Sequence, residues 1–222
     1  MKYLLHIDTA TDIGMIAVTG DGAVLGYRTN NESRNHASTI NNMIADVLTE
    51  VQLSLKNINA VVVSGGPGSY TGLRIGLSTA KGLCYALDVP LIMDSRLTLL
   101  AWQAYKNRNM DYDQYITLIT AREKEYFISI YDKDFICKLI PQHITEEQLQ
   151  NIIQKTVTTH ITTNATEYVV KSLNIINLEI NTDITTDLIS WGFYAFEQYK
   201  CNNIVNLSSA EPFYLKQVYT HK

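Results

Sequence analysis

Cysteine and long apolar runs are scarce in this chain of 222 residues. The three cysteines, Cys84, Cys137 and Cys201, are odd in number and more than fifty residues apart, which fits neither a disulfide framework nor a Cys-x-x-Cys metal knuckle. We expect them to be buried free thiols in a reducing cytosol. No stretch approaches the roughly twenty apolar residues of a membrane span, and the apolar run at residues 3–7 is too short for a signal peptide. We therefore expect a cytoplasmic protein without a membrane partner.

Positive charge is also sparse. The chain holds 18 lysines and arginines against 22 acidic residues, for a net charge of −4, and no run of basic residues occurs. We therefore do not expect this chain alone to bind RNA or DNA electrostatically. If a nucleic acid is involved, a partner must hold it.

Glycine is nearly absent from the second half of the chain. Ten of the eleven glycines lie at or before Gly82, and Gly192 is the exception. A phosphotransferase that clasps a nucleotide between two lobes needs close backbone approach from both of them. The asymmetry predicts that any nucleotide site is incomplete or is shared with another chain.

The first half holds a dense glycine run at residues 64–76, with five glycines and one proline. The run follows the apolar stretch 60–63 and leads into apolar residues at helical spacing, from Leu73 to Cys84. The pattern predicts a strand, a glycine turn and a helix, for which Thr71 is a suitable N-cap. Bare backbone N–H groups then gather where an anion or another backbone can approach closely.

Known nucleotide and nucleophile loops do not fit this run. A Walker loop needs lysine after its last glycine, where Leu73 stands, and a Rossmann fingerprint needs a third glycine at Thr71. A nucleophile elbow needs glycines two residues before and after Ser69, where Pro67 and Thr71 stand.

Hydrophobic periodicity predicts an α/β fold with a duplicated plan. The first set is three strands (3–7, 14–18, 23–27), a helix (38–54), a strand (60–63), a helix ending near 87, a strand (91–93) and a helix (96–105). The second set is three strands (115–120, 126–131, 135–140), a helix (145–155), a strand (157–163) and helices at 165–173 and 187–199. We expect an N-terminal lobe at 1–107 and a smaller C-terminal lobe at 108–222.

Several segments resemble the TsaB (YeaZ) family of the actin-like ATPase superfamily (ASKHA, ribonuclease H-like fold). They are residues 7–11 (IDTAT), His36-Ala37, residues 66–76 (GPGSYTGLRIG), residues 80–83 (AKGL) and the closing residues 211–216 (EPFYLK). The likeness is strong over the first hundred residues. Beyond them, Thr120-Ala121-Arg122 replaces the family's Asp-Ala-Arg turn, and the stretch 151–186 lacks its glycines.

The resemblance implies a role in making threonylcarbamoyladenosine in tRNA. TsaB proteins do not perform the transfer. They pair with a catalytic relative, TsaD, in a complex completed by the ATPase TsaE, and they also self-associate. The implied function is a non-catalytic subunit that binds and activates TsaD, forms a homodimer in isolation and meets tRNA only through the complex.

The metal and nucleotide chemistry of the superfamily is incomplete here. TsaD binds metal through two histidines one helical turn apart, and the matching positions are His36 and Ile40. We expect no metal and no catalytic residue, and His36 either bonds locally or meets a partner. The nucleotide-binding candidates are Asp8, Thr9, Gly66, Gly68 and Ser69. We expect no cofactor on this chain alone, with ATP or ADP at a shared interface. For Asp8, closing a turn through its own side chain is favoured over handling a phosphate, because the second half offers no glycine clamp.

Gly72, Gly76 and Ala80 recur every four residues and line one bare stripe of the predicted helix. Such a stripe faces either a second helix or the protein's own sheet, and periodicity alone leaves the two about even. The resemblance favours a helix–helix interface. The interface candidates are His36, Ile40, Met43, Ile44, Gly72, Arg74, Ile75, Gly76 and Ala80.

Arg74 places a cation near the positive end of the helix dipole. An acidic partner, an anion or a neighbouring subunit should therefore hold it. Two rival functions stay open: a self-sufficient enzyme, either a metal-dependent peptidase or a small actin-like ATP-dependent kinase, and a regulatory homodimer. The peptidase needs a metal pair or a nucleophile–base pair that the sequence does not offer, and the kinase needs tight ATP binding.

Overall fold

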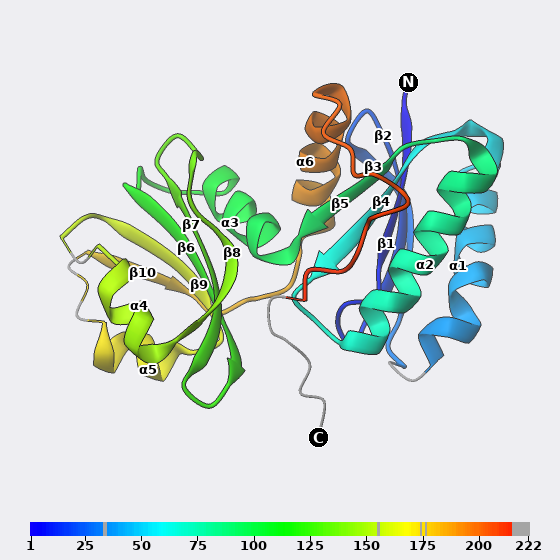
Figure 1. The fold of residues 1–222 in the computed structure, drawn as a ribbon. Coiled ribbons are helices and arrows are strands. Elements are labelled where there is room, and N and C mark those ends of the chain that lie inside the picture. The colour runs from blue at the N-terminus through cyan, green and yellow to red at the C-terminus, as the bar shows by residue number, and fades with distance from the viewer. Residues whose placement is uncertain (33–34, 155, 174, 176, 215–222) are drawn as a thin grey trace, which may run out of the picture. The chain divides into compact units, whose positions relative to one another are not determined.

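The computed structural model describes residues 1–32, 35–154, 156–173, 175 and 177–214, which form two compact units (Figure 1). Unit 1 comprises Met1–Arg96 and Leu188–Tyr214, and unit 2 comprises Leu97–Asp187. Each unit is built on one five-stranded sheet. Within the described residues, no helix combines the length and the apolar character that crossing a membrane requires.

The sheet of unit 1 combines an antiparallel meander with two parallel strands. Its strands are β1 (Tyr3–Asp8), β2 (Gly14–Gly20), β3 (Ala23–Asn30), β4 (Ile58–Gly66) and β5 (Leu91–Ser95), in the order β3-β2-β1-β4-β5. The parallel strands are joined by crossovers that contain α1 (His36–Glu50), the short 3-10 helix η2 (Leu55–Asn57) and α2 (Tyr70–Leu87). This order confirms the predicted meander and the helices that follow it.

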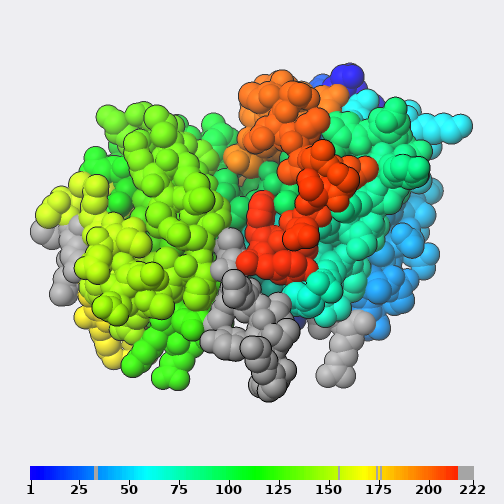
Figure 2. Space-filling view, in the orientation of Figure 1, coloured from blue at the N-terminus to red at the C-terminus, as the bar shows by residue number. Residues whose placement is uncertain are grey.

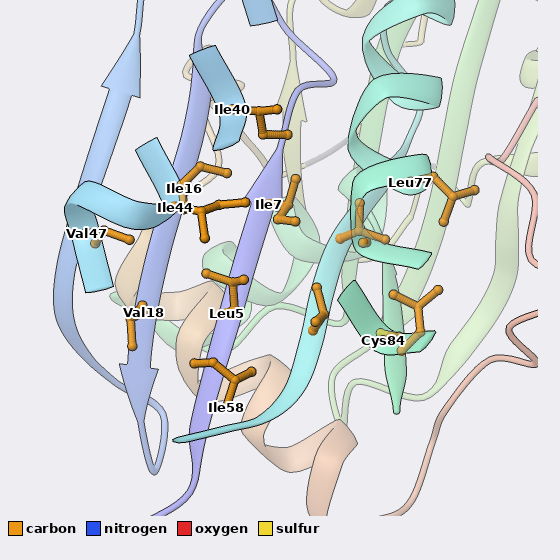
Figure 3. Packing of buried hydrophobic residues seen from close by; sticks show 14 of the residues in the cluster. Leu5, Ile7, Ile16, Val18, Ile40, Ile44, Val47, Ile58, Leu77 and Cys84 are labelled. Carbon is orange, nitrogen blue, oxygen red and sulfur yellow. The ribbon is translucent and has the colours of Figure 1, made fainter. Parts of the chain in front are cut away.

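Alternate residues of β1 face opposite sides of this sheet, because side chains alternate along a strand. Leu5 and Ile7 pack in the core beneath α1 and α2, where Figure 3 shows Ile40, Ile44 and Val47 of α1 pointing toward the strands. His6 lies on the other side, edge-on to Trp191 of α6 (Leu188–Lys200) at 4.9 Å between ring centroids. Both faces of β1 are therefore covered.

Helix α6 approaches the β2–β3 turn closely at a pair of glycines. A Cβ on Gly192 would lie 2.4 Å from the carbonyl oxygen of Gly22, closer than side-chain atoms are found in proteins. Glycine is therefore required for this contact. It explains the one glycine of the second half of the chain.

The sheet of unit 2 repeats the topology of unit 1. Its strands are β6 (Gln114–Arg122), β7 (Glu125–Asp132), β8 (Cys137–Thr145), β9 (Thr159–Thr163) and β10 (Leu178–Asn181), in the order β10-β9-β6-β7-β8. Helices α4 (Glu146–Ile152) and α5 (Thr166–Ser172) join the parallel strands. The two sheets match strand for strand, so the predicted duplication is confirmed.

Both faces of the second sheet carry apolar side chains. Ile116, Leu118 and Ile128 belong to one core with residues of α4 and α5. Tyr115 and Tyr131 belong to another, with Ala101 and Ala104 of α3 (Arg96–Lys106). Unit 2 therefore has a core on each side of its sheet, like unit 1.

The units differ from the expected continuous halves 1–107 and 108–222. Helix α3 groups with unit 2, and α6 groups with unit 1, because Trp191 and Gly192 pack against β-structure of unit 1. Strand β10 was not predicted. The expectation of three buried thiols is wrong, since Cys84 is buried while Cys137 and Cys201 are exposed.

Candidate functional site

The glycine run forms the end of β4, a loop and the first turn of α2. Gly66 adopts a φ of +106°, which favours glycine. Ser69 is the N-cap of α2, and its hydroxyl accepts a hydrogen bond from the Gly72 amide at 3.2 Å. The predicted cap, Thr71, lies within the first turn and is exposed. The helix begins two residues earlier than a Thr71 cap requires.

The end of β1 packs directly on this loop. The Ser69 amide donates to the Ala10 carbonyl at 2.7 Å, and the Thr9 hydroxyl donates to the Gly72 carbonyl at 2.6 Å. A Cβ on Gly68 would lie 2.2 Å from the Ala10 oxygen. The structure thus brings the two groups of nucleotide-binding candidates together, and the close approach that the glycines permit is made by the chain's own backbone.

Asp8 is buried at the end of β1. One of its carboxylate oxygens, Oδ1, accepts a hydrogen bond from the Ala10 amide at 2.8 Å. Burial raises the pKa of Asp8, and the Ala10 hydrogen bond and the charge of Arg96 act against that rise. The side chain closes its own turn, which is the structural role that the sequence also allowed.

The matching junction of unit 2 is bridged by side chains. At the end of β9, the Asn164 side chain accepts from the Thr120 amide at 2.8 Å, and the Thr163 hydroxyl accepts from the Ala165 amide at 2.9 Å. Unit 1 makes one of the corresponding links from backbone to backbone, between the Ser69 amide and the Ala10 carbonyl. Unit 2 therefore needs no glycine at this place, where unit 1 has Gly68 and Gly72.

His36 and Ile40 are both buried and face unit 1 itself. The His36 Nε2 atom lies 3.1 Å from the Thr11 carbonyl oxygen and must donate there, because a carbonyl only accepts. A Cβ on Gly14 would lie 2.7 Å from the Nδ1 atom of His36. Ile40 is 3% exposed and packs in the core. The prediction that His36 bonds locally is confirmed, and its placement at a partner interface is wrong.

The small-residue stripe of α2 also faces inward. A Cβ on Gly72 would lie 1.9 Å from the Thr9 carbonyl oxygen, and one on Gly76 would lie 2.5 Å from the Thr9 hydroxyl. Ala80 is fully buried, and Ile44 of α1 lies in the same core. The assignment of Gly72, Gly76, Ala80 and Ile44 to a helix–helix interface is therefore wrong, because the sheet of unit 1 occupies that space.

A groove between α1 and α2 remains on the surface. It has a volume of about 510 Å³. Its lining residues are Ala37, Ile40, Asn41, Tyr70, Thr71, Arg74, Ile75, Ser78 and Thr79. Of the predicted interface residues, Arg74 is exposed, and Met43 and Ile75 are half-buried. These three are still available to a partner.

Arg74 is held by two tyrosines. Its Nε donates to the Tyr214 hydroxyl at 2.7 Å, and its guanidinium carbon lies 4.2 Å from the centroid of the Tyr70 ring. The two tyrosine rings stack on each other at 5.1 Å. An arginine at this end of a helix needs a partner, and aromatic faces supply one within the chain.

The closing segment comprises residues 203–214, of which the sequence did not indicate residues 203–210 as part of the site. Figure 2 shows it in red on the surface of unit 1 beside α2. The Phe213 amide donates to the Gly65 carbonyl at 2.9 Å, and Lys81 of α2 donates to the Ala210 carbonyl at 3.2 Å. The resemblance marked residues 211–216, of which Leu215 and Lys216 lie outside the described residues. Its Pro-Phe-Tyr sequence was the available signal.

Comparison with known proteins establishes the family. The family model for "TsaD: tRNA N6-adenosine threonylcarbamoyltransferase" matches residues 25–135, which is half of the chain. The "tRNA threonylcarbamoyladenosine biosynthesis protein TsaB" of Escherichia coli strain K12 is 35% identical over 131 residues. The chain belongs to the TsaB (YeaZ) family. The alignment covers 59% of this TsaB-family chain and 55% of the E. coli protein, so it spans about half the length of the curated relatives.

Solved structures extend the likeness to the whole fold. YeaZ from Pseudomonas aeruginosa superposes with a TM-score of 0.76 at 22% identity, over 97% of this TsaB-family chain and 100% of that one. A Bacteroides thetaiotaomicron protein with an actin-like ATPase fold gives a TM-score of 0.50 at 10% identity, over 87% and 96% of the chains. These identities speak to the fold alone, and the predicted actin-like ATPase fold is confirmed.

Proposed function

We propose that this chain is a non-catalytic subunit in the formation of threonylcarbamoyladenosine in tRNA, and that it binds and activates a TsaD-family partner through α1 and α2. Its TsaB-family membership supports the pathway. The observation that carries the non-catalytic role is the placement of His36 and Ile40. The His36 ring donates to the Thr11 carbonyl, and Ile40 is an aliphatic side chain in the core.

The glycine loop supports the same reading. Its close backbone contacts are made by Thr9 and Ala10, which take up space that the glycines leave open. The isolated chain should therefore bind ATP or ADP weakly, and a nucleotide should bind tightly only at an interface with the partner. Titration calorimetry of the pure chain with ATP measures this directly, and tight binding would favour a kinase instead.

The partner set follows from the family. We expect a heterodimer with a TsaD-family protein, completed by a TsaE-family ATPase, and a homodimer when the chain is alone. The tRNA should be bound through the assembled complex, because this chain has a net charge of −4 and no run of basic residues. The exposed Arg74 and the half-buried Met43 and Ile75 mark the surface that we assign to the partner.

Transfer of the threonylcarbamoyl group to tRNA tests the proposal. We expect no transfer by the isolated chain, slow transfer by the TsaD-family protein of the same organism, and faster transfer when the two are mixed with the TsaE-family protein and ATP. The two chains should also co-elute from a sizing column. Robust transfer by the isolated chain would contradict the non-catalytic role, and failure to co-elute would contradict the pairing.

A further inference from the structure

The groove between α1 and α2 carries positive charge and no negative charge among its lining residues. Its lining is apolar or neutral apart from Arg74, and none of the lining residues is an aspartate or glutamate. The first turn of α2 also carries no acidic residue. The partial positive charge of a helix N-terminus therefore adds to that of Arg74. A partner surface that docks in this groove therefore meets one positive charge, that of Arg74, among otherwise neutral lining residues.

The guanidinium of Arg74 is fixed in place and only partly used. Tyr70 covers one face and Tyr214 accepts from Nε, which restrains the side chain. Within the described residues, its two terminal nitrogens make no hydrogen bond, and no ion pair joins it to Glu211, the nearby acidic residue that acts on its charge. The outer edge of the guanidinium remains open to a new acceptor.

From this geometry, and building on the proposed function, we infer that Arg74 is the charge-recognition residue of the docking surface. The occupant of the groove is a protein partner that places an aspartate or glutamate carboxylate against the terminal nitrogens of Arg74. Two parallel N–H to oxygen bonds match the planar guanidinium to a carboxylate, and docking removes water from both groups. Because the tyrosines already hold the side chain, less conformational freedom is lost on binding.

The groove lining of a second copy of this chain does not supply that carboxylate. Two copies docked groove to groove would present Arg74 to each other's lining, which contains no acidic residue. In a symmetric contact of this kind, neither guanidinium group meets a carboxylate from the other copy's groove lining. The electrostatics therefore favour a different chain in the groove, and the homodimer should be the weaker of the two pairings.

Charge substitutions at Arg74 test the inference, with the TsaD-family protein of the same organism as the probe. Calorimetric dissociation constants are measured for the unaltered chain and for Arg74→Gln, Arg74→Lys and Arg74→Glu. We expect Arg74→Gln to weaken binding by about 30-fold, since it leaves the partner's carboxylate unpaired. Arg74→Lys should weaken it less, and Arg74→Glu should weaken it well beyond Arg74→Gln because two negative charges would meet.

The matched control is Lys56→Gln, which removes one exposed positive charge of unit 1 outside the groove. It should leave the dissociation constant unchanged. Thermal unfolding of each variant verifies that the fold is kept, as expected for an exposed side chain. In the unaltered chain, binding should weaken from about 0.05 M to 0.5 M salt, and this dependence should diminish in Arg74→Gln.

The outcomes separate this inference from the proposed function. If the unaltered chain binds and Arg74→Gln and Arg74→Glu bind equally well, the pairing stands and the carboxylate contact is overturned. Equal weakening by both variants also overturns it, because a neutral contact gives that result. If the unaltered chain does not bind, both proposals fail together.

Discussion

The hydroxyl of Thr9 donates to the carbonyl of Gly72 across 2.6 Å, joining the end of β1 to the first turn of α2. The same threonine lies under Gly76, one turn further along the helix. The small-residue stripe of α2 has the spacing of a helix–helix contact. In this chain, Thr9 of the β1–β2 hairpin packs against it instead. The first two predictions follow from this contact.

Replacing Gly72 with alanine should destabilise unit 1 by about 3 kcal/mol or more, since the new Cβ would lie 1.9 Å from a backbone oxygen that cannot move freely. Gly82→Ala is the matched control in the same helix, because nothing lies within 4 Å of its Cβ position. That variant should gain about 0.5–1 kcal/mol from helix propensity. Urea unfolding measures both, and equal effects would refute the steric argument.

Thr9→Val keeps the shape of the side chain and removes the hydroxyl. It should lower the free energy of unfolding by about 1–2 kcal/mol, because the buried hydrogen bond to Gly72 is lost. Thr9→Ser retains the donor and should keep more of the stability. If Ser is as destabilising as Val, then the methyl group and not the hydrogen bond holds the hairpin.

A buried carboxyl should make stability depend on pH. Asp94 accepts from the Trp191 indole at 2.8 Å, and burial raises its pKa from 3.8 to about 7. Between these values the folded chain binds a proton that the unfolded chain has released, so this group's contribution to stability is lost as pH rises from about 4 to 7. Asp94→Asn should remove that loss, which amounts to about 4 kcal/mol at most.

His6, on the same side of the sheet, should act in the opposite direction. Burial lowers its pKa from 6.5 to about 3, so the unfolded chain binds the extra proton between these values and stability rises with pH. Relative to the unaltered chain, His6→Gln should therefore lose stability as pH rises from about 3 to 6.5, whereas Asp94→Asn should gain. Chemical denaturation at several pH values gives both slopes, and slopes of the same sign would contradict the assignment.

The closing segment should depend on Phe213. A Cβ on Gly65 would lie 2.6 Å from the Phe213 ring, so the ring sits directly on the backbone at the end of β4. Phe213→Ala should speed hydrogen exchange of the amide at position 213 by about tenfold, because the ring's burial is lost. Tyr85→Ala, at an aromatic side chain that is 83% exposed on α2, is the control and should leave that exchange unchanged.

The sequence predicted much of the fold because both sheets follow strong local patterns. The short apolar segments of β1 and β2 and the helical spacing from Ile40 to Val47 each depend on burial that neighbouring residues share. Strand β10 was not predicted, because it is four residues long and lies at a sheet edge in a polar stretch. The placement of α3 and α6 depends on contacts between distant segments, such as Trp191 with Asp94, which periodicity does not encode.

The site was harder to predict for a related reason. The spacing of Gly72, Gly76 and Ala80 is the same whether a partner helix or a strand lies against them, and only the position of Thr9 decides between the two. The need of Arg74 for a partner could be predicted, because it lies near the positive end of the helix dipole. That Tyr214 meets this demand from 140 residues away was not visible.

Unit 1 both begins and ends the described chain, since Leu188–Tyr214 completes it. On the ribosome, Trp191 and Phe213 emerge only after all of unit 2 has been made. Until then the His6 and Asp94 side of β1 and β5 has no cover from α6, and Gly65 has no ring above it. Nascent unit 1 therefore cannot complete its fold until these residues emerge, whereas unit 2 has its full sequence available earlier and can be completed first, against the usual N-terminal-first order.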